Sequence, residues 1–474
     1  MEWIAGRKEE QLLMNQLLAS NKPAFLAVYG RRRVGKTFLI RQVYQKQIVF
    51  QMTGVARANT PQQLANFFSV LKEADVSVAQ DFPPKNWFDA FGLLKNYLQK
   101  SKAPKKVIFF DELPWIDTPR SNFLSALEHF WNSWASARPD IILVVCGSAA
   151  SWMITKLINN RGGLYNRVTQ RIRLLPFTLH ETELFFRNNQ IKLDRYQILQ
   201  LYMAFGGIPF YLSEIRPGKS AFQEIDRLAF SKNAILVTEY ENLYRSLFNH
   251  AERHITVIET IAKKNKGLSR EEIVKASGFN DGGALTTVLR ELAESGFISK
   301  SYPFGKKIRD SIYRLTDQYS LFYLKFIKDQ KQAGSGSWLN RIDNPVWRAW
   351  SGYAYENICF QHIDSLKKTL GISGVYTEES SWLDKARSVQ IDLLIDRRDH
   401  VINLCEVKFT QNPFSLTKAY KEELERKSFA FKEETQTPKS VFPTLITTFG
   451  LKENIHSLGF IQNSITMDGL FEPG

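Results

Sequence analysis

The chain has 474 residues, of which 44% are hydrophobic and 23% are charged. These proportions are ordinary for soluble globular protein and exclude a largely disordered chain, and the length suggests about three or four domains. Lysine and arginine number 63 against 48 acidic residues, a formal net charge of +15. That excess favours a polyanionic partner, most simply nucleic acid, although a cytosolic protein can also be basic without such a partner.

Neither the N-terminus nor the cysteines indicate export. The sequence begins MEWIAGRKEE, without an apolar signal region, and runs such as IILVVC are far too short to span a bilayer. Cys146, Cys359 and Cys405 are far apart and show neither zinc spacing nor a disulfide framework. We expect buried, reduced thiols and a cytoplasmic location.

A nucleotide-binding pattern lies near the N-terminus. The mostly apolar run from Ala24 to Gly30 predicts a buried strand, and FLIRQVYQ, starting at Phe38, has helical spacing. Between them, GRRRVGKT matches the P-loop pattern G-x-x-x-x-G-K-[ST] at every fixed position. The predicted nucleotide-binding residues here are Gly30, Arg31, Arg32, Arg33, Val34, Gly35, Lys36, Thr37 and Phe38.

Each part of this loop has a chemical reason. Glycines let backbone N–H groups surround phosphates, and the helix N-terminus adds positive partial charge. Lys36 would reach the β- and γ-phosphates, and Thr37 would hold Mg²⁺. Three adjacent arginines in a turn need a nearby anion, which a triphosphate supplies, although some of these side chains can instead face DNA or a neighbouring subunit.

Two further strands end in polar residues that complete the site. The apolar run from Val107 to Phe110 is followed by Asp111, expected to bind Mg²⁺ through water, and Glu112, expected to orient and deprotonate the attacking water. The strand in DIILVVCGSAASWM ends at Ser148, which is placed to sense the γ-phosphate, although serine is also ordinary turn chemistry.

The first 215 or so residues resemble the archaeal-type AAA+ ATPases, which are related to the signal-transduction (STAND) ATPases and to origin-recognition ATPases. The resemblance implies an AAA+ core over residues 1–180, a parallel sheet flanked by helices, and a helical lid over residues 181–248. The matching stretches are GRKEE, YGRRRVGKT, FFDE, CGSAASWM, GGLYNRVTQRIRLLPFTLHE and GGIPFYL.

The resemblance also implies roles for single residues. Gly6 and Arg7 would lie against the adenine side of the nucleotide, and Pro209 of GGIP would pack near it from the lid. Arg167 would be presented to the γ-phosphate of a neighbouring subunit in a homo-oligomer, an effect that is worth ~10³–10⁵ in rate where it operates. The alternatives are a local ion pair for Arg167 and a helix-breaking turn for GGIP. Competing arginines are Arg161, Arg171 and Arg173.

Residues 249–330 predict a winged-helix domain. Its pattern is an amphipathic helix, ITVIETIAKKNK, a second helix that starts with a capping box at Ser269 and Glu272, and a third helix followed by a basic hairpin. The third helix, with Arg290, would enter a major groove, and hairpin residues would contact phosphate. Such modules also dock proteins. The basic hairpin residues are Lys306, Lys307 and Arg309.

The segment KQAGSGSWLN, residues 331–340, predicts a linker to a last domain over residues 341–474. There, the runs 390–396 and 401–409 predict two strands joined by the turn RRDH. Folding this hairpin places Asp392 opposite Cys405 and Glu406, and the two-residue spacing puts Glu406 and Lys408 on one face.

Asp392, Glu406 and Lys408, with Glu356 on the preceding helix, form what metal-assisted phosphodiester cleavage needs. Glu356, Asp392 and Glu406 would hold Mg²⁺, and Lys408 would position water or stabilise charge. The pattern resembles the PD-(D/E)xK nuclease superfamily and the restriction-endonuclease-like domain often found after this ATPase type. Tyr420 and Lys427 lie on the helix that would flank this site. The alternatives are a charged surface hairpin and a nuclease fold that binds DNA without cutting it.

The sequence therefore predicts an α/β multidomain protein that uses ATP and Mg²⁺ and acts on double-stranded DNA, with a Mg²⁺-dependent nuclease domain. A second hypothesis is a nucleotide-gated, STAND-like switch whose rear domains bind DNA or protein without cutting. A third is an AAA+ machine that remodels protein, for which no pore-loop aromatic pattern is evident in the sequence.

Overall fold

The computed structural model describes residues 3–75, 82–158, 166–248, 250–306, 308–329, 336, 338–339, 344–384 and 387–474. The chain forms two compact units, Met1–Leu175 and Pro176–Gly474.

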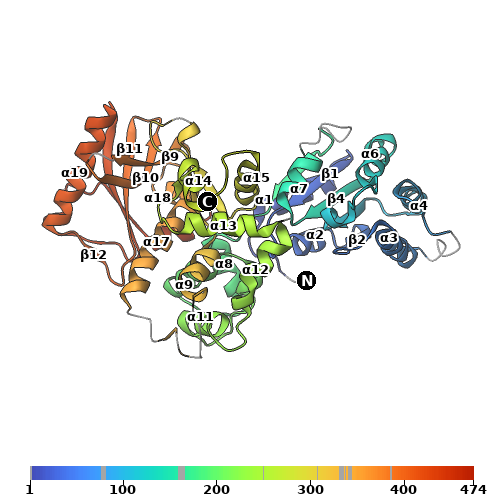
Figure 1. The fold of residues 1–474 in the computed structure, drawn as a ribbon, viewed down its shortest axis with the longest axis horizontal. Coiled ribbons are helices and arrows are strands. Elements are labelled where there is room, and N and C mark those ends of the chain that lie inside the picture. The colour runs from blue at the N-terminus through green and yellow to red at the C-terminus, as the bar shows by residue number, and fades with distance from the viewer. Residues whose placement is uncertain are drawn as a thin grey trace. The chain divides into compact units, whose positions relative to one another are not determined.

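The first unit is a parallel sheet covered by helices (Figure 1). The strand order is β2-β3-β4-β1-β5, and every pairing between these strands is parallel. The three central strands, β3, β4 and β1, are buried almost throughout, which agrees with the apolar runs of the sequence, whereas the edge strands β2 and β5 are more exposed. The strands are β1 (Ala24–Tyr29), β2 (Ile48–Thr53), β3 (Lys106–Asp111), β4 (Ile141–Gly147) and β5 (Gln170–Arg173).

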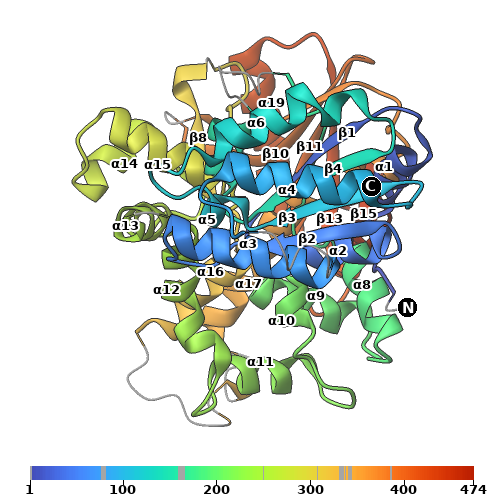
Figure 2. The same ribbon diagram turned by 90° about the vertical axis from the view of Figure 1, so that its right-hand side faces the viewer.

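Aromatic side chains join one face of this sheet to three helices, α3, α4 and α6, whose arrangement is visible in Figure 2. Trp87 and Phe91 of α4 contact Phe67 of α3 and Phe123 of α6, with ring centroids 4.8–6.4 Å apart. The helices and other helical turns of this unit are α1 (Lys8–Ala19), α2 (Lys36–Tyr44), α3 (Thr60–Ala74), α4 (Trp87–Lys100), α5 (Leu113–Ile116), α6 (Phe123–Ser133), η2 (Ala135–Ala137), α7 (Ala150–Trp152) and η3 (Met153–Ile158).

The second unit begins with helices and ends with a mixed sheet. Its first helices are α8 (Leu179–Asn188), α9 (Arg195–Phe205), α10 (Pro209–Leu212), α11 (Ala221–Ala229) and α12 (Ile235–Leu247). Three helices and a small antiparallel sheet, ordered β6-β8-β7, follow. These elements are α13 (Ala251–Ala262), β6 (Leu268–Ser269), α14 (Arg270–Ser277), α15 (Gly283–Glu294), β7 (Ile298–Ser301), η4 (Ile308–Asp310) and β8 (Ile312–Leu315). The capping box predicted at Ser269 and Glu272 is confirmed.

The larger sheet of this unit has the order β15-β13-β11-β10-β9. β9, β10 and β11 are antiparallel neighbours, whereas β11, β13 and β15 are parallel, and α19 connects β11 to β13. The remaining elements are α16 (Gln318–Phe322), η5 (Tyr323–Ile327), α17 (Pro345–Gln361), α18 (Ile363–Thr369), β9 (Thr377–Asp384), β10 (Val389–Arg397), β11 (Val401–Lys408), β12 (Phe414–Ser415), α19 (Lys418–Thr435), β13 (Ser440–Thr447), β14 (Leu451–Lys452), β15 (Asn463–Thr466) and η7 (Met467–Phe471).

The predicted linker, residues 331–340, is anchored at two of its described residues, Gly336 and Trp338. Trp338 is fully buried, and its ring lies 5.0 Å from Phe230 and 5.1 Å from Phe322. The carboxylate of Asp226 accepts hydrogen bonds from the Gly336 and Trp338 amides. The Gly-Ser composition predicted a free spacer, but the single tryptophan has enough apolar area to fix this part of the segment. Most of the other linker residues lie outside the described ranges.

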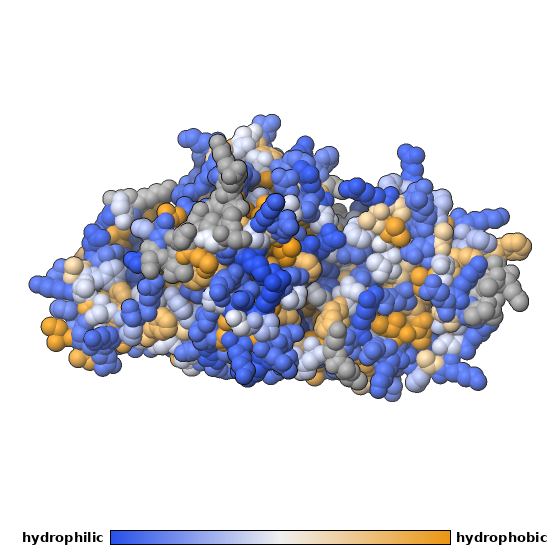
Figure 3. Space-filling model, turned by 90° about the horizontal axis from the view of Figure 1, so that it is seen from below, coloured by the Kyte–Doolittle hydropathy of each residue, from blue (hydrophilic) through white to orange (hydrophobic). Residues whose placement is uncertain are grey.

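The face of the protein seen in Figure 3 is mostly hydrophilic, with small hydrophobic areas between hydrophilic ones. Within the described ranges, no helix combines the length and the apolar character that crossing a membrane requires. All three cysteines are buried and free, as predicted.

Candidate functional site

The loop from Gly30 to Gly35 follows β1 and leads into α2, as the P-loop pattern predicts. Gly30 has φ +150° and a Cβ placed there would lie 2.2 Å from the carbonyl oxygen of Leu174, just after β5. Gly35 has φ +89°, in the left-handed region that glycine adopts without strain. The first glycine is therefore required by close packing against the sheet edge, and the second by backbone conformation.

Lys36, the first residue of α2, is held by the loop and by β4. Only 5% of it is exposed, and its Nζ donates to the carbonyl oxygens of Gly30 at 3.0 Å and Arg31 at 2.9 Å. A third hydrogen bond, of 3.0 Å, goes to Ser148 Oγ. The ammonium group is thus fixed at the mouth of the loop, where P-loop lysines meet phosphate.

Thr37 and Asp111 lie close enough to share a cation. Thr37 Oγ1 donates to Asp111 Oδ2 at 2.8 Å, and the backbone N–H of Glu112 donates to Asp111 Oδ1 at 3.0 Å. A hydroxyl and a buried carboxylate are the oxygen donors that Mg²⁺ prefers in P-loop enzymes. The residues therefore fit the metal that the P-loop implies.

Glu112 joins this group from a strained position at the end of β3. Its φ is +49°, in the left-handed region, and its carboxylate accepts hydrogen bonds from Ser148 Oγ at 2.6 Å and the Ser148 amide at 3.2 Å. Non-glycine residues in such conformations are often found at functional sites. The ends of β1, β3 and β4 thus bring Lys36, Glu112 and Ser148 into one hydrogen-bonded chain.

The three arginines of the loop do not share one environment. Arg31 is 2% exposed, Arg32 is exposed, and Arg33 is partly buried with φ +70°. Val34 is buried and Phe38 is 38% exposed on the outer side of α2.

Gly6 and Arg7 are tied to the same edge of the sheet. The Arg7 guanidinium is buried and donates to the carbonyl oxygen of Leu175 at 2.6 Å. Gly6 accepts a 2.7 Å hydrogen bond from the Gln11 side chain. Because Leu174 packs on Gly30, this anchors the N-terminal segment beside the P-loop, where the resemblance predicted adenine.

The remaining candidates from the ATPase resemblance are more scattered. Arg167 and Arg171 are exposed around β5, whereas Arg161 lies outside the described residues. Pro209 is the first residue of α10, in the second unit. Nearby, Gly207 is required by packing, since a Cβ there would lie 1.9 Å from the carbonyl oxygen of Phe177.

The predicted hairpin in the C-terminal sheet is confirmed as β10 and β11. Cys405 pairs with Leu393, so the prediction that Asp392 lies opposite Cys405 is wrong. The same antiparallel register, continued by one residue, places Asp392 opposite Glu406, the other partner that the sequence predicted. Glu406 is buried and accepts hydrogen bonds from Lys427 Nζ at 2.9 Å and from the Tyr420 hydroxyl. Lys408 Nζ lies 3.0 Å from the same carboxylate.

These neighbours set the charge state of Glu406. Burial alone would raise the pKa of its carboxyl, but the ammonium groups of Lys427 and Lys408 and the Tyr420 hydroxyl outweigh burial and lower the pKa below its usual value. Burial and the Glu406 charge together raise the pKa of Tyr420. Glu406 is therefore a stable, fully paired carboxylate.

Glu356 and Asp392 have partners from another part of the unit. Arg314, on β8, donates to Glu356 Oε1 at 3.1 Å, and Lys266 Nζ, before β6, lies 4.0 Å from Asp392 Oδ1. Burial, followed by the nearby Asp392 charge, raises the pKa of Glu356 to about 7, although Arg314 and Lys266 act in the opposite direction. Sequence reasoning missed Lys266 and Arg314, since nothing in their local pattern links them to residues about 40 or more positions away.

The predicted Mg²⁺ site of Glu356, Asp392 and Glu406 does not fit the observed arrangement. Among the residues that the structure describes, no three His, Cys, Asp or Glu side chains are grouped so that they could hold a metal ion. Each of the three carboxylates instead has a basic partner from the chain itself. We call Glu356, Asp392 and Glu406 together the carboxylate centre.

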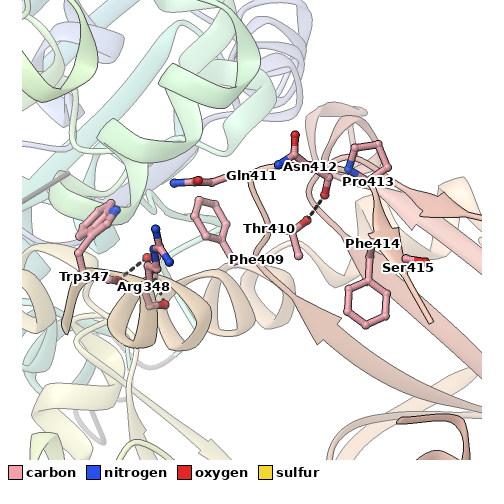
Figure 4. Close-up of a pocket in the computed structure, with 10 residues that line it drawn as sticks. Trp347, Arg348, Phe409, Thr410, Gln411, Asn412, Pro413, Phe414 and Ser415 are labelled. Atoms are coloured by element: carbon pink, nitrogen blue, oxygen red, sulfur yellow. Dashed lines mark hydrogen bonds between the residues drawn. The ribbon is translucent and has the colours of Figure 1, made fainter. Parts of the chain in front are cut away.

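A hollow of about 380 Å³ lies beside the end of β11 (Figure 4). It is lined by Trp347 and Arg348 of α17 and by residues 409–415. The Phe409 ring stacks on Tyr196 at 5.7 Å and lies 5.6 Å from Tyr355, and Trp347 is buried. These rings are therefore already engaged by the protein and do not form an open stacking surface.

The β7–β8 hairpin, expected from its sequence to contact phosphate, is docked at its tip. The Phe304 amide donates to the carbonyl oxygen of Ser381 at 2.8 Å, and the Phe304 ring lies 5.1 Å from Phe431 of α19. Lys306 and Arg309 are exposed, and Lys307 lies outside the described residues.

Comparison with known proteins identifies the first part of the chain. Residues 5–215 match the model of a family described as an ATPase domain predominantly from Archaea. This part is therefore an archaeal-type ATPase domain, with the parallel sheet and loop of a P-loop ATPase core, as predicted.

An uncharacterized protein of Methanocaldococcus jannaschii, MJECL04, is 23% identical over 415 residues, which cover 86% of this chain and 87% of the relative. The aligned 415 residues are more than the family match over residues 5–215 contains, so the similarity to this relative extends beyond the ATPase domain.

Two solved structures are similar over 68% of this chain. The Walker-type ATPase of Pyrococcus abyssi has 16% identity, a TM-score of 0.47 and 96% of its own length covered. The ORC2 protein of Aeropyrum pernix, solved in ADPNP–ADP complexes, has 15% identity, a TM-score of 0.41 and 93% covered. Because both TM-scores are below 0.5, the assignment of a P-loop ATPase fold to the first unit rests on its own strand order and loop geometry.

Proposed function

We propose that this protein binds ATP with Mg²⁺ at the P-loop and hydrolyses it. The observation that carries the proposal is the hydrogen-bonded chain Lys36–Ser148–Glu112 beside the Thr37–Asp111 pair. In this arrangement Lys36 holds the terminal phosphates, and Glu112 holds and deprotonates the attacking water. Thr37 and Asp111 hold Mg²⁺, which neutralises phosphate charge when it is bound.

Two substitutions separate binding from turnover. Lys36→Ala is expected to weaken the binding of a fluorescent ATP analogue and to abolish phosphate release. Glu112→Gln is expected to keep binding and to lose turnover, since the amide cannot take a proton. Lys22→Ala, an exposed lysine of the same unit, is the control. Turnover that survives in Lys36→Ala would exclude this site.

The second part of the proposal is that the protein acts on double-stranded DNA through residues 250–329, in a winged-helix arrangement. Its support is the net charge of +15 and the order of α13, α14 and α15 before the β7–β8 hairpin. Arg290 on α15 and Lys300 on β7 are exposed. Because the hairpin tip is docked through Phe304, these two side chains are better candidates for DNA contacts than the tip.

Salt dependence tests this part. Anisotropy with a labelled duplex gives a log–log slope of affinity against salt concentration. This slope should become shallower by about 0.9 for each phosphate that the protein no longer neutralises in Arg290→Ala or Lys300→Ala. Lys22→Ala should leave the slope unchanged. A slope near zero in the wild type would contradict DNA binding and support a role in protein docking.

For the C-terminal domain, over residues 344–474, we propose a PD-(D/E)xK-type fold in which Asp392, Glu406 and Lys408 are the motif residues. The paired state of the carboxylate centre favours a second candidate function: a nucleotide-gated regulator that binds DNA or a partner without cutting it. Incubation of supercoiled DNA with Mg²⁺ or Mn²⁺ and ATP separates the two. Nicking that disappears in Asp392→Asn would establish the nuclease, and intact DNA throughout would leave the regulator.

Assembly of like subunits through Arg167 belongs to either function, and Arg167→Ala would then lower ATP turnover in a concentration-dependent way.

A further inference from the structure

The tip of the β7–β8 hairpin, residues 302–306, is a turn whose shape its own sequence sets. The Lys306 amide donates to the carbonyl oxygen of Pro303 at 3.0 Å, and Gly305 has φ +70°. These are the features of a four-residue β-turn with glycine at its third position. Phe304 is the second residue of this turn, where a turn that faces solvent usually carries a polar side chain.

Phe304 docks the turn on the C-terminal domain. Its ring packs against the core between the large sheet and α19, 5.1 Å from the Phe431 ring, which lies 5.4 Å from Trp382. Its amide donates a 2.8 Å hydrogen bond to the carbonyl oxygen of Ser381 on β9, the edge strand of that sheet. We call the contacts of Phe304 with Phe431 and Ser381 the tip contact.

The base of the hairpin is held more firmly than its tip. Arg314 of β8 lies 3.1 Å from Glu356, and only 8% and 15% of these two side chains are exposed. A pair buried to this degree is costly to break from one side, because the remaining charge is left without compensation. At the tip, by contrast, Phe304 is only partly buried, and Tyr302 and Lys306 are exposed. The tip can therefore leave its place while β8 stays fixed.

The tip and the turn after it carry cations that the docked position keeps from a duplex. Lys306 ends the β-turn, and Arg309 follows on η4 with 80% of its side chain exposed. The grooves of B-DNA are about 6–12 Å wide, so a turn that rests on the surface of a domain cannot enter one. Burial of one partial ring and one hydrogen bond favour the docked tip by about tenfold to a hundredfold.

We propose that the tip contact is inhibitory: it keeps Lys306 and Arg309 from the phosphate backbone of duplex DNA. Release of the Phe304 ring frees the tip to enter a groove, and both cations then add to the other duplex contacts of residues 250–329. In the wild type the docked state outweighs this gain, so duplex binds chiefly without the tip. This role of the tip rests on the DNA binding proposed above and is independent of ATP turnover.

The test is duplex binding by Phe304→Ala, measured by anisotropy on the full chain near physiological salt. Its affinity should be at least about threefold higher than that of the wild type, because more molecules have a released tip. The log–log slope against salt should be steeper by about 0.9 for each phosphate gained. Phe304→Leu keeps much of the apolar contact and should gain less. The matched control is Phe429→Ala, 67% exposed on α19, which should behave as the wild type.

A second substitution distinguishes an inhibitory contact from a general loosening of the structure. Lys306→Gln should change the affinity of the wild type by less than about twofold, but should lower that of Phe304→Ala clearly, and Arg309→Gln should remove the rest of the gain. Hydrogen exchange without DNA measures the tip contact itself. Peptides that cover Phe431 should exchange faster in Phe304→Ala than in Phe429→Ala.

Each result decides for or against the inhibitory role of the tip contact. That role is overturned if folded Phe304→Ala binds duplex with the affinity and slope of the wild type, or if its gain survives the loss of both cations. Circular dichroism checks folding, and Phe304→Leu decides if Phe304→Ala unfolds. Absence of duplex binding in both the wild type and Phe304→Ala would instead overturn the DNA binding on which this role rests.

Discussion

Ser148 Oγ donates a 2.6 Å hydrogen bond to Glu112 Oε1 and at the same time accepts one from Lys36. The serine at the end of β4 thus connects the phosphate-binding lysine to the residue proposed to activate water. Without this hydroxyl, the Glu112 carboxylate keeps only the 3.2 Å hydrogen bond from the Ser148 backbone amide and loses its connection to Lys36.

Ser148→Ala is therefore expected to lower kcat for ATP about tenfold to a hundredfold, in line with the loss of one positioned donor at an active site. The affinity for nucleotide should change less than about threefold, since the loop glycines and Lys36 remain. Steady-state phosphate release and analogue binding measure the two quantities. Ser133→Ala, whose exposed hydroxyl donates to the His129 carbonyl within α6, is the control and should behave as the wild type.

The two glycines of the loop should respond differently to the same change. Gly30→Ala places a methyl group 2.2 Å from the Leu174 carbonyl oxygen, whereas a methyl group at Gly35 meets no atom of the described residues within 4 Å. We expect a loss of about 3 kcal/mol of stability for Gly30→Ala from overpacking, and about 1 kcal/mol for Gly35→Ala from backbone strain alone. Thermal unfolding of both variants checks that Gly30→Ala loses more stability than Gly35→Ala. Equal losses of stability would contradict the packing role of Gly30.

Much of the first unit could be predicted because its signals are local. A buried strand, a glycine loop and a helix follow each other within about twenty residues, so sequence alone places Lys36 and Thr37. The ends of β3 and β4 are likewise marked by Asp111 and Ser148, after uninterrupted apolar runs.

The carboxylate centre could be predicted only in part. The hairpin was predictable because the strands that carry Asp392 and Glu406 are joined by a short turn. Arg314 was not, since its place beside Glu356 depends on how β8 docks along α17, which no period or motif encodes. Trp338 was not predictable either, because the Gly-Ser composition of its segment indicated a linker and gave no sign that this tryptophan is buried in the core.

The buried His362 predicts an acid-sensitive contact in the second unit. Its Nε2 accepts a 2.9 Å hydrogen bond from the Leu179 amide at the start of α8, and its Nδ1 lies 2.9 Å from the Ile358 carbonyl oxygen, so the ring is neutral. Burial lowers its pKa from 6.5 to about 4. In the unfolded chain the ring takes up a proton below pH 6.5, whereas in the folded chain it does so only near pH 4.

Stability is therefore retained above pH 6.5 and lost as the pH falls from 6.5 to about 4, by at most about 3 kcal/mol for this group. Hydrogen exchange of peptides that cover α8, compared at pH 7 and pH 5, measures the effect. His362→Gln keeps an acceptor for Leu179 but does not titrate, so its protection should depend less on pH than that of the wild type. An identical pH dependence in both proteins would contradict the assignment.

Trp338 should be among the most costly residues of the second unit to truncate. Its ring contacts Phe230, Phe322, Phe326 and Trp347 with centroid distances of 5.0–5.2 Å, and none of it is exposed. Trp338→Ala leaves a cavity in this aromatic cluster and is expected to lower the free energy of unfolding by about 3–5 kcal/mol.

The neighbouring Leu339 provides the matched control for Trp338→Ala. It is 38% exposed, so Leu339→Ala should change stability by about 1 kcal/mol or less. Calorimetry of the wild type, Trp338→Ala and Leu339→Ala compares their losses of stability in the unfolding transition of the second unit. Because the Gly336 and Trp338 amides are bonded to Asp226, Asp226→Asn should weaken the same anchor by a smaller amount. A stable Trp338→Ala protein would mean that the segment after residue 330 is held by Asp226 alone.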